Sequence, residues 1–212
     1  MTKKISLLVF ASILCSNVLA QSGKIQLPAP NGIKTVKMSL MTALQNRHSV
    51  REYNENKDIP AQILSNLLWA ACGYNRPEEK RITAPSALNM QDIVVYVCRK
   101  DGAYRYNPGL NCLEAITTKD LRYAVAGPQS FVKSAPVCLV LVSDQTKFKT
   151  PDKTIGALDA GYVSQNICLS ATAIGLATVP RGTMNKEELI KELGLKENQI
   201  LMVNHPVGWP KQ

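Results

Sequence analysis

The segment 157–175 places the strongest limit on how this chain can fold. Its pattern predicts one long helix with few charges, built largely from small and aliphatic residues. A helix that is apolar on almost all sides must be surrounded by protein. We therefore expect this helix either in the centre of the core or at a subunit interface. Several of its small residues would let a second helix approach closely: Ala157, Gly161, Ser164, Ala171 and Ala173.

The other segments predict an α+β domain over residues 37–212. Helices and strands follow one another without strict strand–helix alternation, which favours a mixed sheet flanked by helices. The apolar run 135–142 fits a central strand that is covered on both faces. Residues 21–36 contain Pro28, Pro30 and Gly32, which discourage regular structure, and we expect a flexible lead-in there. The remaining predicted elements are helices over 38–46, 58–72 (capped by Asp58 and ended by Gly73), 118–125 and 186–193, and strands over 92–98 and 200–203.

The first residues have the pattern of a signal peptide. Two lysines precede the apolar stretch 5–14, and Val18 and Ala20 supply the small residues of a cleavage site before Gln21. The stretch is short for a membrane anchor, and no second hydrophobic span follows it. We expect export to the periplasm and removal of residues 1–20, with no stable membrane insertion afterwards.

Charge and cysteine content narrow the function further. Removal of the two leader lysines lowers the formal net charge from +9 to +7. Because the basic residues are scattered and aromatic residues make up only 6% of the chain, a site for a small anion fits better than a nucleic-acid surface. One of the six cysteines lies in the leader, and the remaining odd number has no CxxC spacing. This gives no zinc signal and leaves disulfide pairing open.

The basic segment 47–53, with the sequence RHSVREY, is the main candidate for an anion site. Alternate side chains of an extended segment share one face, so Arg47, Ser49 and Arg51 would point the same way. Two guanidinium groups and a hydroxyl suit a phosphate, because guanidinium donates charge-assisted pairs of hydrogen bonds. The alternative is a solvated basic edge without a ligand, and this segment alone leaves both interpretations open.

No set of residues forms a catalytic motif. The two histidines, His48 and His205, lack HxxxH or HExxH spacing, and there is neither a GxGxxG after a strand nor a P-loop, so we expect no metal site and no Rossmann or NTP site. The basic segment, a Pro-Ser-Ala-Leu-Asn segment and a Pro-Arg-Gly turn remain. They contain no evident acid or base, which favours an enzyme whose chemistry is carried by a bound cofactor.

Four segments resemble the nitroreductase-like family of FMN-dependent oxidoreductases. They are RHSVREY at 47–53, APSALNMQ at 84–91, the run at 159–180 and VGWPK at 207–211. The resemblance implies an intertwined homodimer with FMN bound at the interface by residues of both subunits. It also implies ping-pong hydride transfer from NADH or NADPH to an electron-poor small molecule, such as a nitroaromatic or a quinone.

The resemblance also assigns residues to the cofactor. Arg47 and Ser49 would hold the phosphate and ribityl chain of FMN, with further contacts from His48. Arg51 would place positive charge near the N1/O2 edge of the isoalloxazine, and Lys211 would replace the basic residues that the family usually carries after the final Gly-x-Pro. A loop of the partner subunit and a turn beneath the ring would complete the site: Pro85, Ser86, Ala87, Leu88, Asn89 and Gln91 in the loop, and Val179, Pro180, Arg181 and Gly182 in the turn, with a backbone N–H near Gly182 facing N5.

Two features leave the activity open. The acidic residue that the family often carries in the ring-lining turn is replaced here by Arg181 or Gly182, so the substrate preference does not carry over. Nicotinamide nucleotides are also not expected outside the cytoplasm, which leaves the electron donor open. The alternatives are a specialised flavin chemistry, of the dehalogenase or flavin-fragmenting type, and a flavin-binding dimer without turnover.

Overall fold

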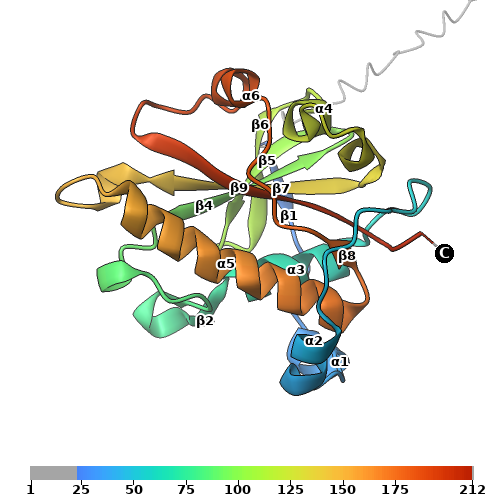
Figure 1. The fold of residues 1–212 in the computed structure, drawn as a ribbon. Coiled ribbons are helices and arrows are strands. Elements are labelled where there is room, and N and C mark those ends of the chain that lie inside the picture. Colours follow the sequence, from blue (N-terminus) through green and yellow to red (C-terminus); the bar gives the residue numbers. More distant parts are fainter. Residues whose placement is uncertain (1–22, 212) are drawn as a thin grey trace, which may run out of the picture.

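The computed structural model describes residues 23–211, and the predicted signal peptide, residues 1–20, lies outside the described residues. One seven-stranded sheet carries helices on both faces, and a separate two-stranded sheet stands beside it (Figure 1). The predicted α+β class, with a sheet flanked by helices, is confirmed.

The large sheet has the strand order β1-β6-β5-β4-β7-β9-β8, and its neighbouring strands pair antiparallel. Strand β7 lies between β4 and β9, and residues 137–143 are all buried, as expected for a central strand. The strand bounds are β1 Lys24–Gln26, β2 Tyr74–Arg76, β3 Arg81–Ile82, β4 Ile93–Arg99, β5 Gly102–Asn107, β6 Cys112–Thr117, β7 Val137–Asp144, β8 Ala177–Thr178 and β9 Gln199–Gly208.

Two helical layers cover the two faces of this sheet. Helices α3 and α5 pack on one face against apolar side chains of β4, β5, β6 and β7. Helices α4 and α6 cover the other face, where Tyr53 is also buried. The helix bounds are α1 Gly32–Thr35, α2 Leu40–Asn46, α3 Ala61–Cys72, α4 Arg122–Ala126, α5 Lys153–Ile174 and α6 Lys186–Glu192, with short 3₁₀ turns η1 Pro77–Glu79, η2 Ala87–Asn89, η3 Ser130–Ser134 and η4 Gln145–Lys147.

Several element ends differ from the sequence-based expectation. Helix α3 begins after Pro60 without a side-chain cap, because Asp58 stands two residues too early to reach the free N–H groups of the first turn. Helix α4 covers only part of 118–125, since the Asp120 carboxylate accepts the N–H of Arg122 and holds the start there. Strand β9 continues beyond the predicted end at residue 203 as far as Gly208. Part of the expected lead-in is strand β1, paired with β6.

Helix α5 is the long helix that the sequence predicts, and it starts four residues earlier than expected. Asp152 caps it, because its Oδ1 accepts the N–H groups of Thr154 at 2.8 Å and Ile155 at 3.2 Å. Gly175 ends it in the left-handed region, with φ of 88°. Between these ends the helix runs across the whole sheet face, as Figure 1 shows.

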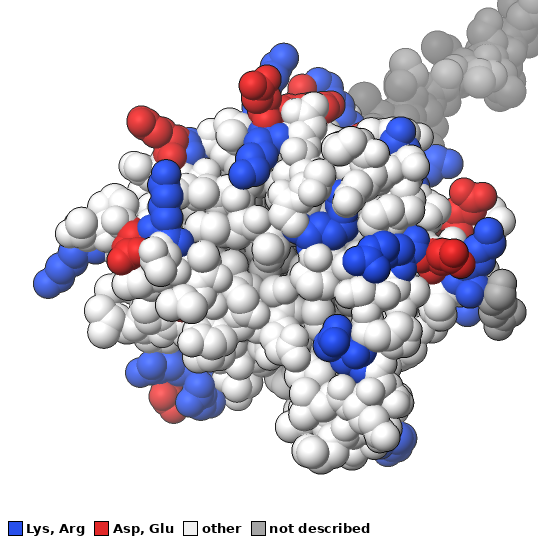
Figure 2. All heavy atoms as spheres, in the orientation of Figure 1, with Lys and Arg blue, Asp and Glu red and all other residues white. Residues whose placement is uncertain are grey.

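One side of α5 is not covered by the rest of the chain. Leu158 and Tyr162 are 56% and 46% exposed, and Ala157 and Gly161, which we expected at a helix contact, lie exposed beside them. Figure 2 shows that the surface over α5 and the neighbouring α2 is largely uncharged. A contiguous apolar face of this kind is typical of an interface. The apolar stripe of α2 also points outward, so that only Ala43 of this helix is buried and three large side chains are exposed: Leu40, Met41 and Leu44.

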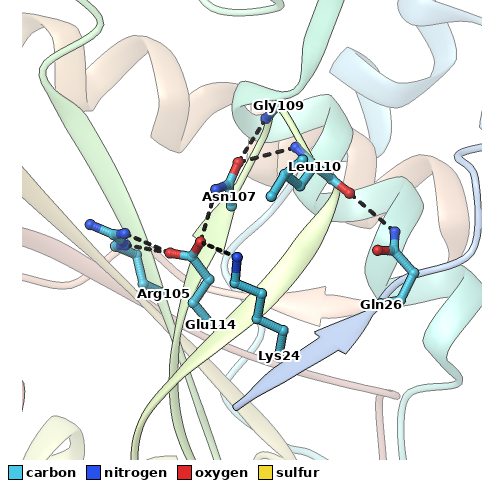
Figure 3. A network of polar contacts seen from close by, with 7 residues as sticks. All are labelled: Lys24, Gln26, Arg105, Asn107, Gly109, Leu110 and Glu114. Atoms are coloured by element: carbon cyan, nitrogen blue, oxygen red, sulfur yellow. Dashed lines mark hydrogen bonds and ion pairs between the residues drawn. The ribbon is translucent and has the colours of Figure 1, made fainter. Parts of the chain in front are cut away.

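The far edge of the sheet is held by a network of polar contacts around Glu114 of β6 (Figure 3). The Glu114 carboxylate accepts from Arg105 Nε at 2.9 Å and Nη2 at 2.6 Å, and from Asn107 Nδ2 at 2.9 Å. Lys24 Nζ of β1 lies 3.8 Å from it. Asn107 Oδ1 in turn accepts the N–H of Gly109 at 3.1 Å, which closes the turn at residues 107–109. The network therefore ties the edge strand to the β5–β6 hairpin.

Two further expectations concern the membrane and the cysteines. Within residues 23–211, no helix is both long enough and apolar enough to span a membrane. The cysteines of the described part of the chain are buried free thiols: Cys72, Cys98, Cys112, Cys138 and Cys168.

Candidate functional site

Three segments that are far apart in the sequence meet along the β8 edge of the sheet. The N–H of Val50 donates to Thr178 O at 3.1 Å, which places the basic segment beside β8. Tyr53 forms an antiparallel bridge with Pro210, and the N–H of Lys211 donates to Glu52 O at 3.2 Å. The backbone thus brings RHSVREY, the end of the 159–180 run and the closing VGWPK segment together, as the resemblance requires.

A groove of about 460 Å³ opens where the basic segment and the C-terminal segment meet. Arg51 and Lys211 line it, together with the acidic Glu52 and Glu55 and the aromatic Tyr53 and Phe131. Within residues 23–211, neither cation forms an ion pair with these acids. The Tyr53 hydroxyl donates to Val50 O at 2.9 Å, which holds the basic segment in its extended shape. Two cationic side chains over an aromatic surface can bind an anion with a flat apolar part.

The remaining predicted anion ligands lie at the start of the basic segment. Burial raises the pKa of the Cys168 thiol and the Arg47 guanidinium opposes this shift, which places Arg47 near Cys168 in the C-terminal part of α5. His48 Nδ1 lies 2.7 Å from Asn46 O, so this ring nitrogen is used locally. In the described part of the chain, no side-chain hydrogen bond or ion pair engages Arg47, Ser49 or Arg51. Their donors remain free for an anion.

The turn at residues 179–182 differs from the expectation at Arg181. This guanidinium is buried and donates to Asn204 Oδ1 at 2.7 Å and Gln129 Oε1 at 2.7 Å, and to two carbonyls at the end of α4. The backbone N–H and C=O of Arg181 also pair with Asn204. The guanidinium of Arg181 is therefore occupied by partners within the chain, and its place in the turn that lines the ring stays a prediction. Gly182 is exposed, and a Cβ there would meet no atom within 4 Å, so a flat ligand could approach its backbone.

The loop 85–91 is held in a strained shape at the other end of α5. Leu88, Asn89 and Gln91 have φ values of 50°, 57° and 51°, which residues with a side chain rarely adopt. Ser86 Oγ accepts the N–H of Gln91 at 3.0 Å, and Gln91 Nε2 donates to Asn89 Oδ1 at 3.0 Å. Leu88 is 88% exposed. Strain that persists in an exposed loop is typical of a functional segment, and here Gln91 orients Asn89.

A carboxylate of α5 fastens this loop. Both oxygens of Asp159 accept the N–H of Ala87, at 2.9 and 3.2 Å. Asp159 and Cys168 are nine positions apart on α5, which is roughly 14 Å along the helix. Because Arg47 lies near Cys168, the two predicted halves of the cofactor site lie well apart in one chain. The structure thus brings the basic segment, the turn and Lys211 together, but it does not bring Pro85–Gln91 to them.

His205 is a structural residue. It is fully buried between Ser164 Oγ, 2.9 Å from Nε2, and Thr178 Oγ1, 3.3 Å from Nδ1. Burial lowers its pKa to about 3, so the ring is neutral at physiological pH. It connects β9 to α5 and β8 beneath the candidate site.

The sequence matches a known family over most of its length. Residues 44–209 match the family model described as the Nitroreductase family. This chain belongs to the nitroreductase family. The resemblance carried by the four segments is thereby confirmed.

Individual relatives of the nitroreductase family agree with this. A protein of Methanocaldococcus jannaschii, named as a candidate nitroreductase, is 30% identical over 87% of this chain and 96% of its own length. A solved structure of a candidate nitroreductase from Ralstonia eutropha JMP134 is 36% identical, with a TM-score of 0.82 and coverage of 90% of both chains. A candidate nitroreductase from Desulfovibrio desulfuricans, solved in complex with FMN, shares the fold at 20% identity, with a TM-score of 0.62 over 83% of this chain and 88% of its own.

Sequence reasoning did not single out the buried polar residues that support the site. Asp159 fastens the loop, and Asn204 holds Arg181. A signal for Asp159 was present, since it is the only charged residue in 154–174. No sequence signal pointed to Asn204, because an Asn in a strand is usually at the surface.

Proposed function

We propose that this protein is an FMN-dependent oxidoreductase of the nitroreductase type that reduces electron-poor small molecules. The observation that carries the proposal is the arrangement of its two site halves on α5. Free cationic and hydroxyl donors lie at one end of this helix, the strained loop 85–91 lies at the other, and an uncovered apolar face connects them.

A homodimer is part of this proposal. Within one chain, loop 85–91 and Arg47 reach α5 about 14 Å apart, at Asp159 and near Cys168, so the loop of a partner subunit could complete the site instead. A two-fold contact through α5 and α2 would cover their exposed apolar residues and place the loop of each subunit at the β8 edge of its partner. Each FMN would then be bound by both chains.

The residues present fit FMN. Arg47 and Ser49 would hold the phosphate and ribityl chain, and Arg51 and Lys211 would add positive charge in the groove. Asn89 of the partner loop would bind an oxygen of the cofactor. The open space above Gly182 would accept the flat ring next to the backbone. When bound, FMN would supply the redox chemistry, taking a hydride from a donor and passing it to an acceptor in the same pocket.

The donor, the acceptor and the compartment belong to the same proposal. NADH or NADPH is the proposed donor, and nitroaromatics or quinones are the proposed acceptors. The pattern of residues 1–20 supports export to the periplasm, where a different reductant would have to replace the nicotinamide nucleotide.

The test starts from the purified protein without residues 1–20. We expect a yellow dimer with absorption near 450 nm, about one FMN per subunit, and bleaching on anaerobic addition of NADH or NADPH followed by reoxidation with a quinone. Light scattering measures the dimer. A colourless monomer that takes up no added FMN would overturn the proposal, and a yellow dimer that no donor reduces would favour a flavin-binding protein without turnover.

Arg47→Ala tests the anion site directly. Loss of hydrogen bonds to a charged phosphate should weaken FMN binding by about 1.5–3 kcal/mol, or roughly 10- to 150-fold in Kd. Quenching of flavin fluorescence gives the Kd. Arg76→Ala is the matched control, because Arg76 is exposed on β2 and is not one of the predicted site residues, so that its Kd should equal that of the wild type. Equal Kd values for the two variants would remove Arg47 from the site.

A further inference from the structure

Two buried carboxyl groups meet beneath loop 85–91 with no cation between them. Asp92 directly precedes β4 and is fully buried, and Asp159 of α5 is 2% exposed. Gly156, three residues before Asp159 on α5, packs against Ser143, which donates to Asp92, and the proximity of Asp159 raises the pKa of Asp92. Within residues 23–211, no ion pair joins a Lys, Arg or His to either of them. Two charged carboxylates in such a place would repel each other strongly.

The hydrogen bonds around the pair leave a gap that one proton would fill. Asp92 Oδ2 accepts from the Ser143 hydroxyl, and Ser143 Oγ accepts from Gln145 Nε2 at 2.6 Å. Asp92 Oδ1 has no partner among the hydrogen-bonding groups of the described residues. Asp159 already accepts the N–H of Ala87. A proton on Asp92 would give Asp159 a donor and would remove one of the two buried charges.

The other charged groups of the surrounding elements leave the pair without compensation. On β7, the Asp144 carboxylate accepts from Thr146 N and Oγ1. Arg81 of β3 lies 3.8 Å from Glu79. Lys147 of η4 and Lys153 at the start of α5 are exposed, and neither forms an ion pair with Asp92 or Asp159. Asp159 is the only ionisable neighbour that shifts the pKa of Asp92.

Tight packing keeps the pair away from solvent. A Cβ at Gly156 of α5 would collide with Ser143 Oγ and would lie 2.7 Å from Gln145 Nε2, so the glycine lets the helix approach β7 closely. The carboxyl pair is therefore buried between α5, β7 and the start of β4. The strained backbone of residues 88–91 is attached directly above this pair through Ala87.

We propose that Asp92 and Asp159 share a single proton and act as positioning residues that hold loop 85–91 in its cofactor-binding shape. The inference rests on the proposed function, in which this loop completes the FMN site of the partner subunit. Loss of the shared proton to solvent leaves two buried negative charges, which repel each other and release the Asp159–Ala87 contact. Burial, together with the neighbouring Asp159, raises the pKa of Asp92 to about 7, so the release occurs as the pH rises through neutrality.

The first test is the pH profile of FMN binding from pH 5.5 to 8.5. In the wild type, the Kd should rise above pH 7 by up to tenfold per pH unit, because binding is linked to one proton. Asp92→Asn keeps a donor toward Asp159 and an acceptor for Ser143, and it cannot ionise. The ratio of wild-type to Asp92→Asn Kd at each pH cancels the titration of the FMN phosphate, and this ratio should rise only above pH 7. Asp92→Ala, which has no donor, should bind weakly at every pH.

A second readout does not depend on FMN. Hydrogen exchange of peptides covering residues 83–92 in the apoprotein, corrected for intrinsic exchange, should show protection that falls between pH 6 and 8.5 in the wild type and stays constant in Asp92→Asn. Asp159→Asn supplies a donor from the other side and should behave like Asp92→Asn, which covers the case that one variant does not fold.

The outcomes separate the inference from the proposed function. The shared proton is overturned if FMN binds tightly at pH 6 while the ratio of wild-type to Asp92→Asn Kd stays constant and hydrogen exchange in the loop does not depend on pH. The proposed oxidoreductase function would still stand in that case. Absence of FMN binding at every pH, together with pH-dependent exchange in the loop, would overturn the oxidoreductase and leave the proton-sharing pair standing.

Discussion

Glu114 and Asp92 are carboxyl groups of neighbouring parts of one sheet, yet their surroundings move the pKa of each in opposite directions. Around Glu114, hydrogen bonds from Asn107 and Arg105 lower the pKa, and Lys24 adds positive charge. Around Asp92, burial and the adjacent Asp159 raise the pKa to about 7. Both carboxylate oxygens of Glu114 accept hydrogen bonds, whereas Asp92 Oδ1 has no hydrogen-bond partner within residues 23–211.

The difference shows where this fold tolerates an unsatisfied polar group. At the outer edge, a complete network around Glu114 ties the edge strand to the β5–β6 hairpin. Beneath loop 85–91, the chain keeps two buried acids that are costly unless they hold a proton. Buried polar groups without a hydrogen-bond partner are common where a residue has a functional role.

The largest expected contrast between the two regions is in the pH dependence of stability. Between the unfolded pKa of Asp92, near 3.8, and its folded value of about 7, the folded state holds a proton that the unfolded state has lost. Stability should therefore fall as the pH rises through this range, by at most about 1.4 kcal/mol per pH unit, and then level off. Denaturant unfolding of the apoprotein measures it, with Asp92→Asn as the reference that lacks this slope. If the stability of the wild type and of Asp92→Asn depends on pH in the same way, the pKa of Asp92 is not raised and the contrast with Glu114 does not hold.

A smaller effect is expected from removal of the other acid. Asp159→Ala leaves the buried N–H of Ala87 without an acceptor and should lower the free energy of unfolding by about 1–3 kcal/mol at pH 6. Asp58→Ala is the matched control, because this exposed carboxylate does not cap α3 and its loss should change stability by less than about 0.5 kcal/mol. If both variants unfold at the same denaturant concentration, Asp159 does not hold the loop.

The smallest effect is expected at the outer edge. Glu114→Gln removes the charge but keeps the shape, and since Arg105 is half exposed it should cost only about 0.5–1 kcal/mol at pH 7. Because folding lowers the pKa of Glu114, this contribution to stability is present above the unfolded pKa and is lost as the pH falls through the folded pKa. The pH dependence of stability is therefore opposite in sign to that expected from Asp92. Glu79→Gln, at an exposed position, controls for surface charge. A difference that persists unchanged at pH 3 would show that shape, and not charge, is responsible.

Much of the fold could be predicted, because it depends on local patterns. Helix α5 was predicted from its composition, and the structure places part of it in the core: Val163 and Ile167 are buried, while Leu158 and Tyr162 are exposed. Its role at a subunit interface stays a prediction. The end of α3 at Gly73 was likewise predicted from the residue type. The start of α3 was not, because an acid two residues from the cap position looks the same in sequence as a capping one.

The candidate site was predictable to a lesser degree. The basic segment and Lys211 were named from residue type and resemblance, and the structure places Arg51 and Lys211 in one groove. The sequence did not show that the Arg181 guanidinium turns inward to Asn204 and the end of α4, because these partners are distant along the chain.

The sequence by itself determined the family, the apolar character of α5 and the residue types that can bind a phosphate, because these depend on side-chain chemistry and on spacing along the chain. Only the tertiary structure decided which polar groups are free and which are used. The partners of Arg181, Asp92 and Asp159 lie between 23 and 72 positions away, and their hydrogen bonds depend on contacts that form only when the helices close over the sheet.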